Sequence, residues 1–163
     1  MSPELNWART QDQKLFRRQQ ILDAAQAHFK DVGYEAFSMA NLAKLSGVAK
    51  GTLYLYFTTR EEVFLALYGQ SLVRWSEAFI SGLPAAMHDR DYCQRLHSTA
   101  MADEGFVPLL VRLEHIIEHN VSFARLIESK RLFAKRLGHV AEASATVLGL
   151  TQTQAQALVK AMG

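Results

Sequence analysis

Three residues in the second half of the chain have a spacing that suits a metal ion. His115, Glu118 and His119 form an H-x-x-E-H pattern, which places both imidazoles on one side of a helix with the carboxylate beside them as a general base. A catalytic zinc also needs a third protein ligand, and only Glu128 and Glu142 supply acidic side chains after the pattern. We therefore expect no metal or other cofactor, and a zinc-dependent hydrolase stays the alternative function.

A second pair could do nucleophilic chemistry. Cys93 and His97 lie one helical turn apart, but a catalytic thiol needs a lowered pKa and an orienting group, and the sequence offers no third partner. We expect a packed or surface cysteine. With a single cysteine in the chain, an internal disulfide is excluded.

A third set of residues suits contact with DNA. Lys50 and Thr52 stand near the start of a short helix, where they could reach base edges, and the hydroxyls of Tyr54 and Tyr56 could reach phosphate oxygens. Gly51 removes a side chain where the backbone would have to approach closely. Both tyrosines could instead be half-buried core residues.

Two short helices must position these side chains. Ser38 predicts a capped helix start, and Gly47 predicts its end, because glycine tolerates a positive φ. A second helix follows over about residues 49–57, with Leu53 and Phe57 on one side. The spacing fits a helix-turn-helix, in which the second helix enters the major groove, although an ordinary helical hairpin fits it too.

The flanking segments favour the helix-turn-helix. An apolar face predicts a helix over about residues 13–32 that Gly33 ends. Thr59 with Glu62 is a capping-box pattern, and Thr58 with Glu61 is an overlapping alternative. Three helices around one small core would make a compact domain, from which a fourth helix leads away over residue 60 to about 80.

The segment 18–62 resembles the N-terminal DNA-binding domain of the TetR family of bacterial transcription regulators. The resemblance rests on Ile21-Leu22, Ala25, Phe29, Gly33-Tyr34, Ser38, Leu42-Ala43, Gly47-Val48, Lys50-Gly51-Thr52-Leu53-Tyr54, Tyr56-Phe57 and Glu61. Two positions depart from the pattern. Ala49 stands where the family often has a capping Ser, and Arg60 where it usually has Lys.

From the residues and this resemblance together we predict an all-α protein. It would have a homeodomain-like helix-turn-helix domain at 1–60 and a helical ligand-binding and dimerisation domain at 61–163, apparently short at the C-terminus. The DNA contacts would come from Ser38, Lys44, Lys50, Gly51, Thr52, Tyr54, Tyr56 and Arg60, with Arg17 and Arg18 as weaker candidates.

Charge and composition agree with this assignment. Residues 1–60 carry 8 Lys and Arg against 5 Asp and Glu, whereas residues 61–163 carry 10 against 11. The basic excess therefore lies in the half that would neutralise phosphates. The polar N-terminus does not read as a signal peptide, and no apolar run has membrane-spanning length, so we expect a cytoplasmic protein that does not associate with a membrane.

The second half reads as further helices. We expect them over about residues 91–102, 107–119 and 123–148, and from a Thr151–Gln154 capping box onward. The resemblance implies a pocket for a small effector, mostly apolar or aromatic, with His115, His119 or Arg112 fixing one polar group. The candidate lining is Trp75, Phe79, Met87, Met101, Phe106, His115, His119 and Phe123.

The resemblance also implies a homodimer that binds a palindromic operator, usually as a repressor. In the family, two C-terminal helices from each subunit usually form a four-helix bundle, and here only the beginning of the first is present. Either the chain is shortened or it dimerises differently. Effector binding would tilt the fourth helix and so change the spacing of the two recognition helices.

Overall fold

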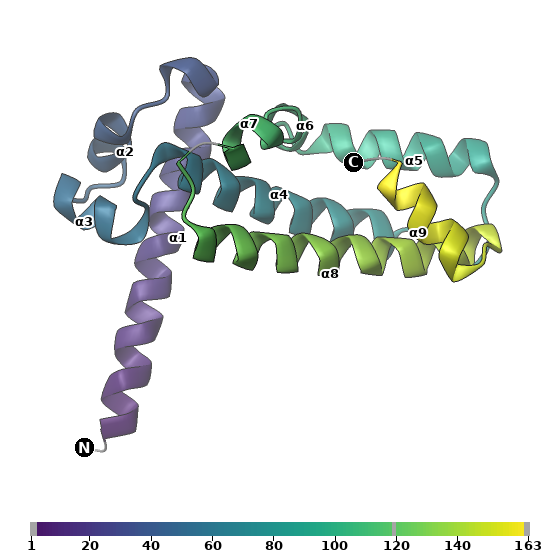
Figure 1. Ribbon diagram of the computed structural model, residues 1–163, viewed down its shortest axis with the longest axis horizontal. Helices are drawn as coiled ribbons and strands as arrows, with labels where there is room; N and C mark the ends of the chain where they lie inside the picture. Colours follow the sequence, from purple (N-terminus) through teal and green to yellow (C-terminus); the bar gives the residue numbers. More distant parts are fainter. Residues whose placement is uncertain (1–2, 119, 162–163) are drawn as a thin grey trace. The chain divides into compact units, whose positions relative to one another are not determined.

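All of the regular secondary structure in the described part of the chain is helical, as predicted. The computed structural model describes the backbone of residues 3–118 and 120–161, and the side chains of residues 11–114, 116, 120–158, 160 and 161. The helices are α1 (Pro3–Ala36), α2 (Met39–Leu45), α3 (Lys50–Tyr56), α4 (Arg60–Ser81), α5 (Asp89–Ala102), α6 (Phe106–Leu110), α7 (Leu113–Glu118), α8 (Phe123–Leu148) and α9 (Gln152–Lys160) (Figure 1). None of the described helices combines the length and the apolar character needed to span a bilayer.

The chain divides into two compact units. The N-terminal unit is Met1–Leu67 and the C-terminal unit is Tyr68–Gly163. Helix α4 begins in the first unit and ends in the second. The division at residue 60 that we drew from the sequence assigns the whole of α4 to the second domain, and we keep it as a functional proposal.

The N-terminal unit is built around a cluster of aromatic rings. Gly33 interrupts α1 with φ 72° and ψ −175°, a conformation that only glycine adopts readily, and this is the helix end that the sequence predicted. The chain then turns back, so that Tyr34 and Phe37 reach the ring of Phe64 on α4, each with its centroid 4.7 Å away. Phe29 packs edge-on against Phe64 at 5.3 Å. These ring contacts hold α1 and the chain that follows it against the start of α4.

Local signals in the sequence set the boundaries of α2 and α3. The Oγ of Ser38 accepts a hydrogen bond from the backbone N–H of Asn41 at 3.2 Å, which caps α2. Gly47 adopts φ 66° in the turn that follows. Leu53 and Phe57 are fully buried and anchor α3 against the unit. The predicted helix-turn-helix is therefore confirmed as a local structure.

The start of α4 shows a modified capping box. The backbone N–H of Glu62 donates to the Thr59 hydroxyl at 3.2 Å, as the Thr59–Glu62 pattern predicted. The Glu62 carboxylate accepts from the backbone N–H of Thr58 at 2.9 Å. Because this one side chain ties down the residues between α3 and α4, the C-terminal end of α3 is held in place.

The long helices of the C-terminal unit are α5, α8 and the part of α4 from Tyr68 onward, and Figure 1 shows α4 and α8 running side by side. A side chain at Gly69 of α4 would come within 3.1 Å of Leu132 on α8, so the two helices pack closely there. A buried hydrogen bond of 2.7 Å joins Tyr92 of α5 to Ser144 of α8. The Arg95 guanidinium donates to the carbonyl oxygens of Ala78 and Phe79, which ties α5 to the end of α4.

Two of the sequence-based helix boundaries in this unit were wrong. The expected helix over 107–119 is instead α6 and α7, because the N–H of Arg112 bonds to the carbonyl of Leu109 three residues back, which tightens and ends the turn. Helix α5 begins at Asp89, two residues earlier than expected, and acidic residues in its first turn suit the positive end of a helix dipole. The Thr151–Gln154 box is confirmed, with Thr151 Oγ accepting from the Gln154 N–H at 3.3 Å.

Candidate nucleic-acid interface

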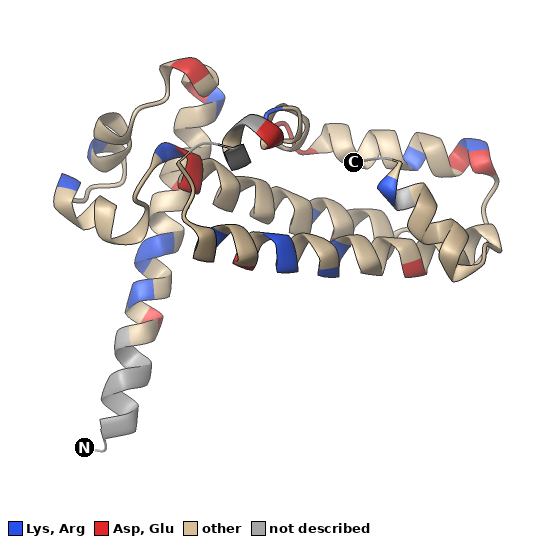
Figure 2. Cartoon of the chain, in the orientation of Figure 1, with Lys and Arg blue, Asp and Glu red and all other residues tan. Residues whose placement is uncertain are grey.

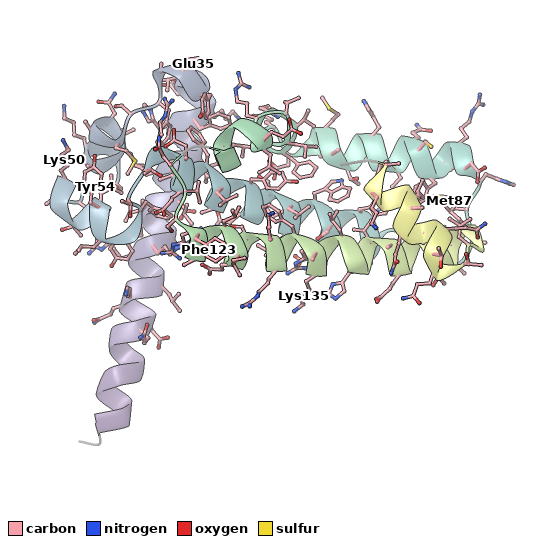
Figure 3. The ribbon with its side chains drawn as sticks, viewed as in Figure 1. Glu35, Lys50, Tyr54, Met87, Phe123 and Lys135 are labelled. Atoms are coloured by element: carbon pink, nitrogen blue, oxygen red, sulfur yellow. The ribbon has the colours of Figure 1, made fainter. Side chains whose placement is uncertain are left out.

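Helix α3 buries one side and opens the other to solvent. Lys50 and Gly51 are exposed, the side chain of Tyr54 is 42% exposed, and Thr52 and Tyr56 are half-buried. Figure 3 labels Lys50 and Tyr54 on this helix. The polar residues that we singled out are thus not sealed within the unit, and a large partner can reach them.

Leu55 is the residue of α3 that sequence reasoning missed. Its side chain is 80% exposed, the largest value among the exposed large hydrophobic side chains of the described residues. At about 100° of rotation per residue, a position two residues from both Leu53 and Phe57 lies on the opposite side of the helix. The spacing of Leu55 from Leu53 and Phe57 in the sequence already indicates this outward position.

Two of the predicted contacts on α2 differ in how their side chains are used. Ser38 is half-buried, and its hydroxyl is occupied as the cap of α2. Lys44 lies exposed in the last turn of α2, and its ammonium group has no ionic partner in the described part of the chain. Lys44 can therefore meet a phosphate without breaking an internal contact.

Arg60 is less available than a surface charge would be. Its Nε donates to the Glu61 carboxylate at 2.9 Å, and its guanidinium lies 4.9 Å from the ring centroid of Tyr34. The hydrogen bond to Glu61 raises the pKa of Arg60 above its ordinary value, so the group stays cationic. Glu61 offsets part of that charge, and we expect Arg60 to attract a phosphate less strongly than Lys44 or Lys50 does.

Further basic side chains of the N-terminal unit lie on α1 (Figure 2). Arg17 is exposed, whereas Arg18 is half-buried with its guanidinium 5.1 Å from the ring centroid of Phe57. Arg18 therefore supports the C-terminal end of α3 through a cation–π contact. Ala49 precedes α3 without a side-chain cap, as its departure from the family pattern implied.

The C-terminal unit holds a row of stacked aromatic rings. Phe106 stacks on Trp75 with centroids 5.2 Å apart and on Tyr68 at 5.9 Å, and Trp75 stacks on Phe79 at 5.8 Å. All four rings are buried. Burial raises the pKa of Tyr68 to about 12.

The indole of Trp75 leaves a hydrogen-bond donor unused. Its Nε1 is buried and has no hydrogen-bond partner among the residues that the structure describes. An unsatisfied buried donor costs about 1–3 kcal/mol, so a ligand oxygen or nitrogen that accepted this bond would recover free energy on binding.

Four other predicted lining residues are less enclosed. Met87 and Arg112 are half-buried, whereas Met101 is 56% and Phe123 is 77% exposed. The side chain of His115 and all of His119 lie outside the described residues. As ligand contacts, these six residues stay predictions, and so do the buried Trp75, Phe79 and Phe106.

The two catalytic patterns fare differently. His119 and the side chains of His115 and Glu118 lie outside the described part of the chain, so the zinc hypothesis is not tested there. Elsewhere in the described residues, no group of three His, Cys, Asp or Glu side chains could hold a metal ion. Of the two expectations for Cys93, a packed or a surface cysteine, the structure shows the second, because Cys93 is exposed.

Matches to known families cover both units. Residues 21–67 match the bacterial regulatory proteins, tetR family, and residues 69–162 match the tetracyclin repressor-like C-terminal domain. The chain belongs to the TetR family. Members of this family regulate transcription through an N-terminal helix-turn-helix, and here that motif is α2, the turn and α3.

Curated relatives match part of the TetR-family chain. The Fatty acid metabolism regulator protein of Bacillus subtilis (strain 168) is 35% identical over 65 residues, which are 40% of this chain and 34% of that protein. The HTH-type transcriptional activator FasR of Mycolicibacterium smegmatis is 36% identical over 92 residues, 56% of this chain and 40% of that protein. The HTH-type transcriptional repressor AcnR of Corynebacterium diphtheriae is 34% identical over 74 residues, which are 45% of this chain and 39% of that protein. The chain thus aligns with only 34–40% of the length of these relatives.

Solved structures share the fold. The multidrug binding protein EbrR, complexed with imidazole, superposes with a TM-score of 0.62 at 20% identity, over 90% of this chain and 79% of that chain. A TetR-family transcriptional regulator from Streptomyces coelicolor gives the same TM-score at 19% identity, over 89% and 77%. At such identities the likeness establishes the architecture and not the ligand.

Proposed function

We propose that this TetR-family chain is a ligand-responsive repressor that binds a palindromic DNA operator as a homodimer. The observation that carries the proposal is the outward face of α3, where Lys50, Gly51 and Tyr54 are open to solvent while Leu53 and Phe57 hold the helix from behind. A helix presented in this way can lie in the major groove, which is wide enough to admit it.

The contacts divide into two kinds. Lys50 and Thr52, near the start of α3, read base edges and supply sequence discrimination. Tyr54, Tyr56 and Lys44 bind phosphates and set the register of the helix along the groove, with weaker help from Ser38 and Arg60. Gly51 lets the backbone of α3 come close to the DNA.

The C-terminal unit takes a small effector that is mostly apolar or aromatic. The stacked rings of Trp75, Phe79 and Phe106 support this proposal, because a planar molecule can join such a stack. Because the indole N–H of Trp75 has no partner among the described residues, we also propose that the effector carries a hydrogen-bond acceptor. A protein of the same architecture, EbrR, is a multidrug binding protein, which is compatible with a ligand of this kind.

Helix α4 couples the two sites. It is one continuous helix from Arg60, directly after the helix-turn-helix, to Ser81, and it carries Trp75 and Phe79. An effector that prefers a tilted α4 would change the spacing of the two recognition helices, which must lie about 34–36 Å apart for half-sites one turn apart. The loss of DNA affinity equals the effector's preference for that state, typically about 1–3 kcal/mol.

Selection of bound fragments from bacterial genomic DNA tests the proposal. We expect a palindromic site to be enriched and the purified complex to contain two chains per site. Enrichment of single half-sites would contradict the homodimer, and no enrichment above a protein-free control would contradict the DNA-binding function itself.

The effector is tested separately. A panel of planar aromatic molecules, with and without a carbonyl group, is added to the complex of protein and selected DNA. We expect release by a carbonyl-bearing member, and a smaller release from Trp75→Phe, which keeps an aromatic ring but has no N–H. Equal release from the parent and Trp75→Phe would contradict the role of the indole.

A further inference from the structure

Leu55 occupies the centre of the solvent face of α3. It lies opposite the buried Leu53 and Phe57, and its side chain is 80% exposed. An isolated exposed leucine is ordinary on a protein surface. This one stands between Tyr54 and Tyr56, on the side of the helix that the proposed function turns toward DNA.

The surface beside Leu55 is open. A helical side chain leans toward the N-terminal end of its helix, so Leu55 lies over the turn that contains Gly51, four residues earlier. Gly51 is exposed, and a Cβ placed on it would meet nothing within 4 Å. The solvent side of α3 is therefore open both at Leu55 and at Gly51, one turn earlier.

Little on the floor of the major groove matches an exposed apolar side chain such as that of Leu55. The base edges there present hydrogen-bond donors and acceptors, except for thymine, which carries a C5-methyl group. An apolar side chain that lies on this methyl group gains contact area and leaves no polar edge unsatisfied. Leucine opposite any other base would remove water from a polar edge without returning a hydrogen bond.

The geometry points to Leu55 as a specificity-determining residue that reads the C5-methyl group of one thymine in each half-site of the operator. The inference rests on the proposed function, since it needs α3 in the major groove. It adds an apolar contact to the polar readout by Lys50 and Thr52. Each half-site then contains a required thymine next to the positions that those two residues read.

Replacing thymine by uracil tests the inference, because uracil pairs with adenine in the same way and lacks only the methyl group. A duplex selected with the parent protein is resynthesised with deoxyuridine at each thymine in turn, and affinity is measured for the parent, Leu55→Ala and Leu15→Ala. Leu15 is the matched control: its side chain is 64% exposed and lies on α1.

We expect one thymine per half-site whose replacement weakens the parent about fourfold, the value of one methyl group removed from water. The Leu15→Ala variant should lose the same fourfold in affinity when that thymine is replaced by uracil. Leu55→Ala should bind the thymine and uracil duplexes equally, and selection with this variant should no longer require that thymine. Circular dichroism should show unchanged helix content in both variants.

Failure of the inference is distinct from failure of the function. If the parent selects an operator but no uracil replacement weakens it, or if Leu55→Ala keeps the full uracil effect, Leu55 does not read the methyl group and the regulator assignment stands. If Leu55→Ala binds DNA as the parent does but becomes monomeric, the surface around Leu55 is an interface between copies of this chain, and the inference fails. If the parent selects no DNA, the proposed function fails.

Discussion

The solvent face of α3 and the aromatic row of the C-terminal unit are built in opposite ways. On α3, Lys50 and Leu55 are open to water and hold no part of the core together. In the aromatic row, Trp75 and Phe106 are buried, and the same rings that would meet an effector also form the core. The difference implies that binding and stability are separable in the first region and coupled in the second.

The largest expected effect tests that separation directly. Phe106→Ala removes a ring stacked between Tyr68 and Trp75, and should destabilise the protein by about 3–5 kcal/mol. Leu55→Ala, at an exposed site, should change stability by less than about 0.5 kcal/mol. Thermal unfolding followed by near-ultraviolet circular dichroism measures both, and equal losses would mean that the two regions do not differ in this respect.

A smaller effect is expected at alkaline pH. The folded pKa of Tyr68 is about 12, above the value of about 10 that tyrosine has in an unfolded chain. The contribution of this residue is fully present below pH 10 and is lost as pH rises through 12, because only the unfolded chain ionises in that window. The loss reaches about 2–3 kcal/mol.

Tyr68→Phe keeps the ring and removes the ionisation. Its free energy of unfolding should therefore fall less steeply than that of the parent between pH 10 and 12. Denaturant titrations at several pH values measure the two slopes, with pH 7 as the internal reference. Parallel curves would show that the Tyr68 hydroxyl is not buried in solution.

The smallest effect compares two helix caps, one in each unit. Ser38→Ala and Thr151→Ala each remove a hydroxyl that accepts a backbone N–H bond, at 3.2 Å and 3.3 Å, and each should cost about 1 kcal/mol. Only Ser38→Ala should also weaken DNA binding, because α2 is part of the helix-turn-helix. A comparable loss of DNA affinity in Thr151→Ala would contradict the division of labour between the units.

The N-terminal unit was readable from the sequence because its signals are local. Ser38, Gly33 and Gly47 act within a few residues of themselves, and the spacing of Leu53 and Phe57 defines which side of α3 is buried. The helix-turn-helix was therefore predicted with nearly its observed bounds.

What the sequence did not show depends on contacts between distant residues or on turns without a marker. The break between α6 and α7 falls at Val111 and Arg112, and neither residue is a glycine or a proline, the residue types that usually indicate a helix end. The unused N–H of Trp75 exists only because of how its neighbours pack. The pairing of Arg60 with Glu61 is a contact between neighbours, and it still required coordinates, because the sequence suggested only a phosphate contact or a free surface charge.

The measurement that tests the central claim most directly is the affinity of the selected operator for the parent, Lys50→Ala and Lys135→Ala. Lys135 is an exposed lysine on α8, in the C-terminal unit, and serves as the control for a lost positive charge (Figure 3). We predict that Lys50→Ala binds about tenfold more weakly, that Lys135→Ala binds as the parent does, and that the parent's affinity falls steeply with salt. Unchanged binding by Lys50→Ala, or a flat response to salt, would contradict the placement of α3 in the major groove.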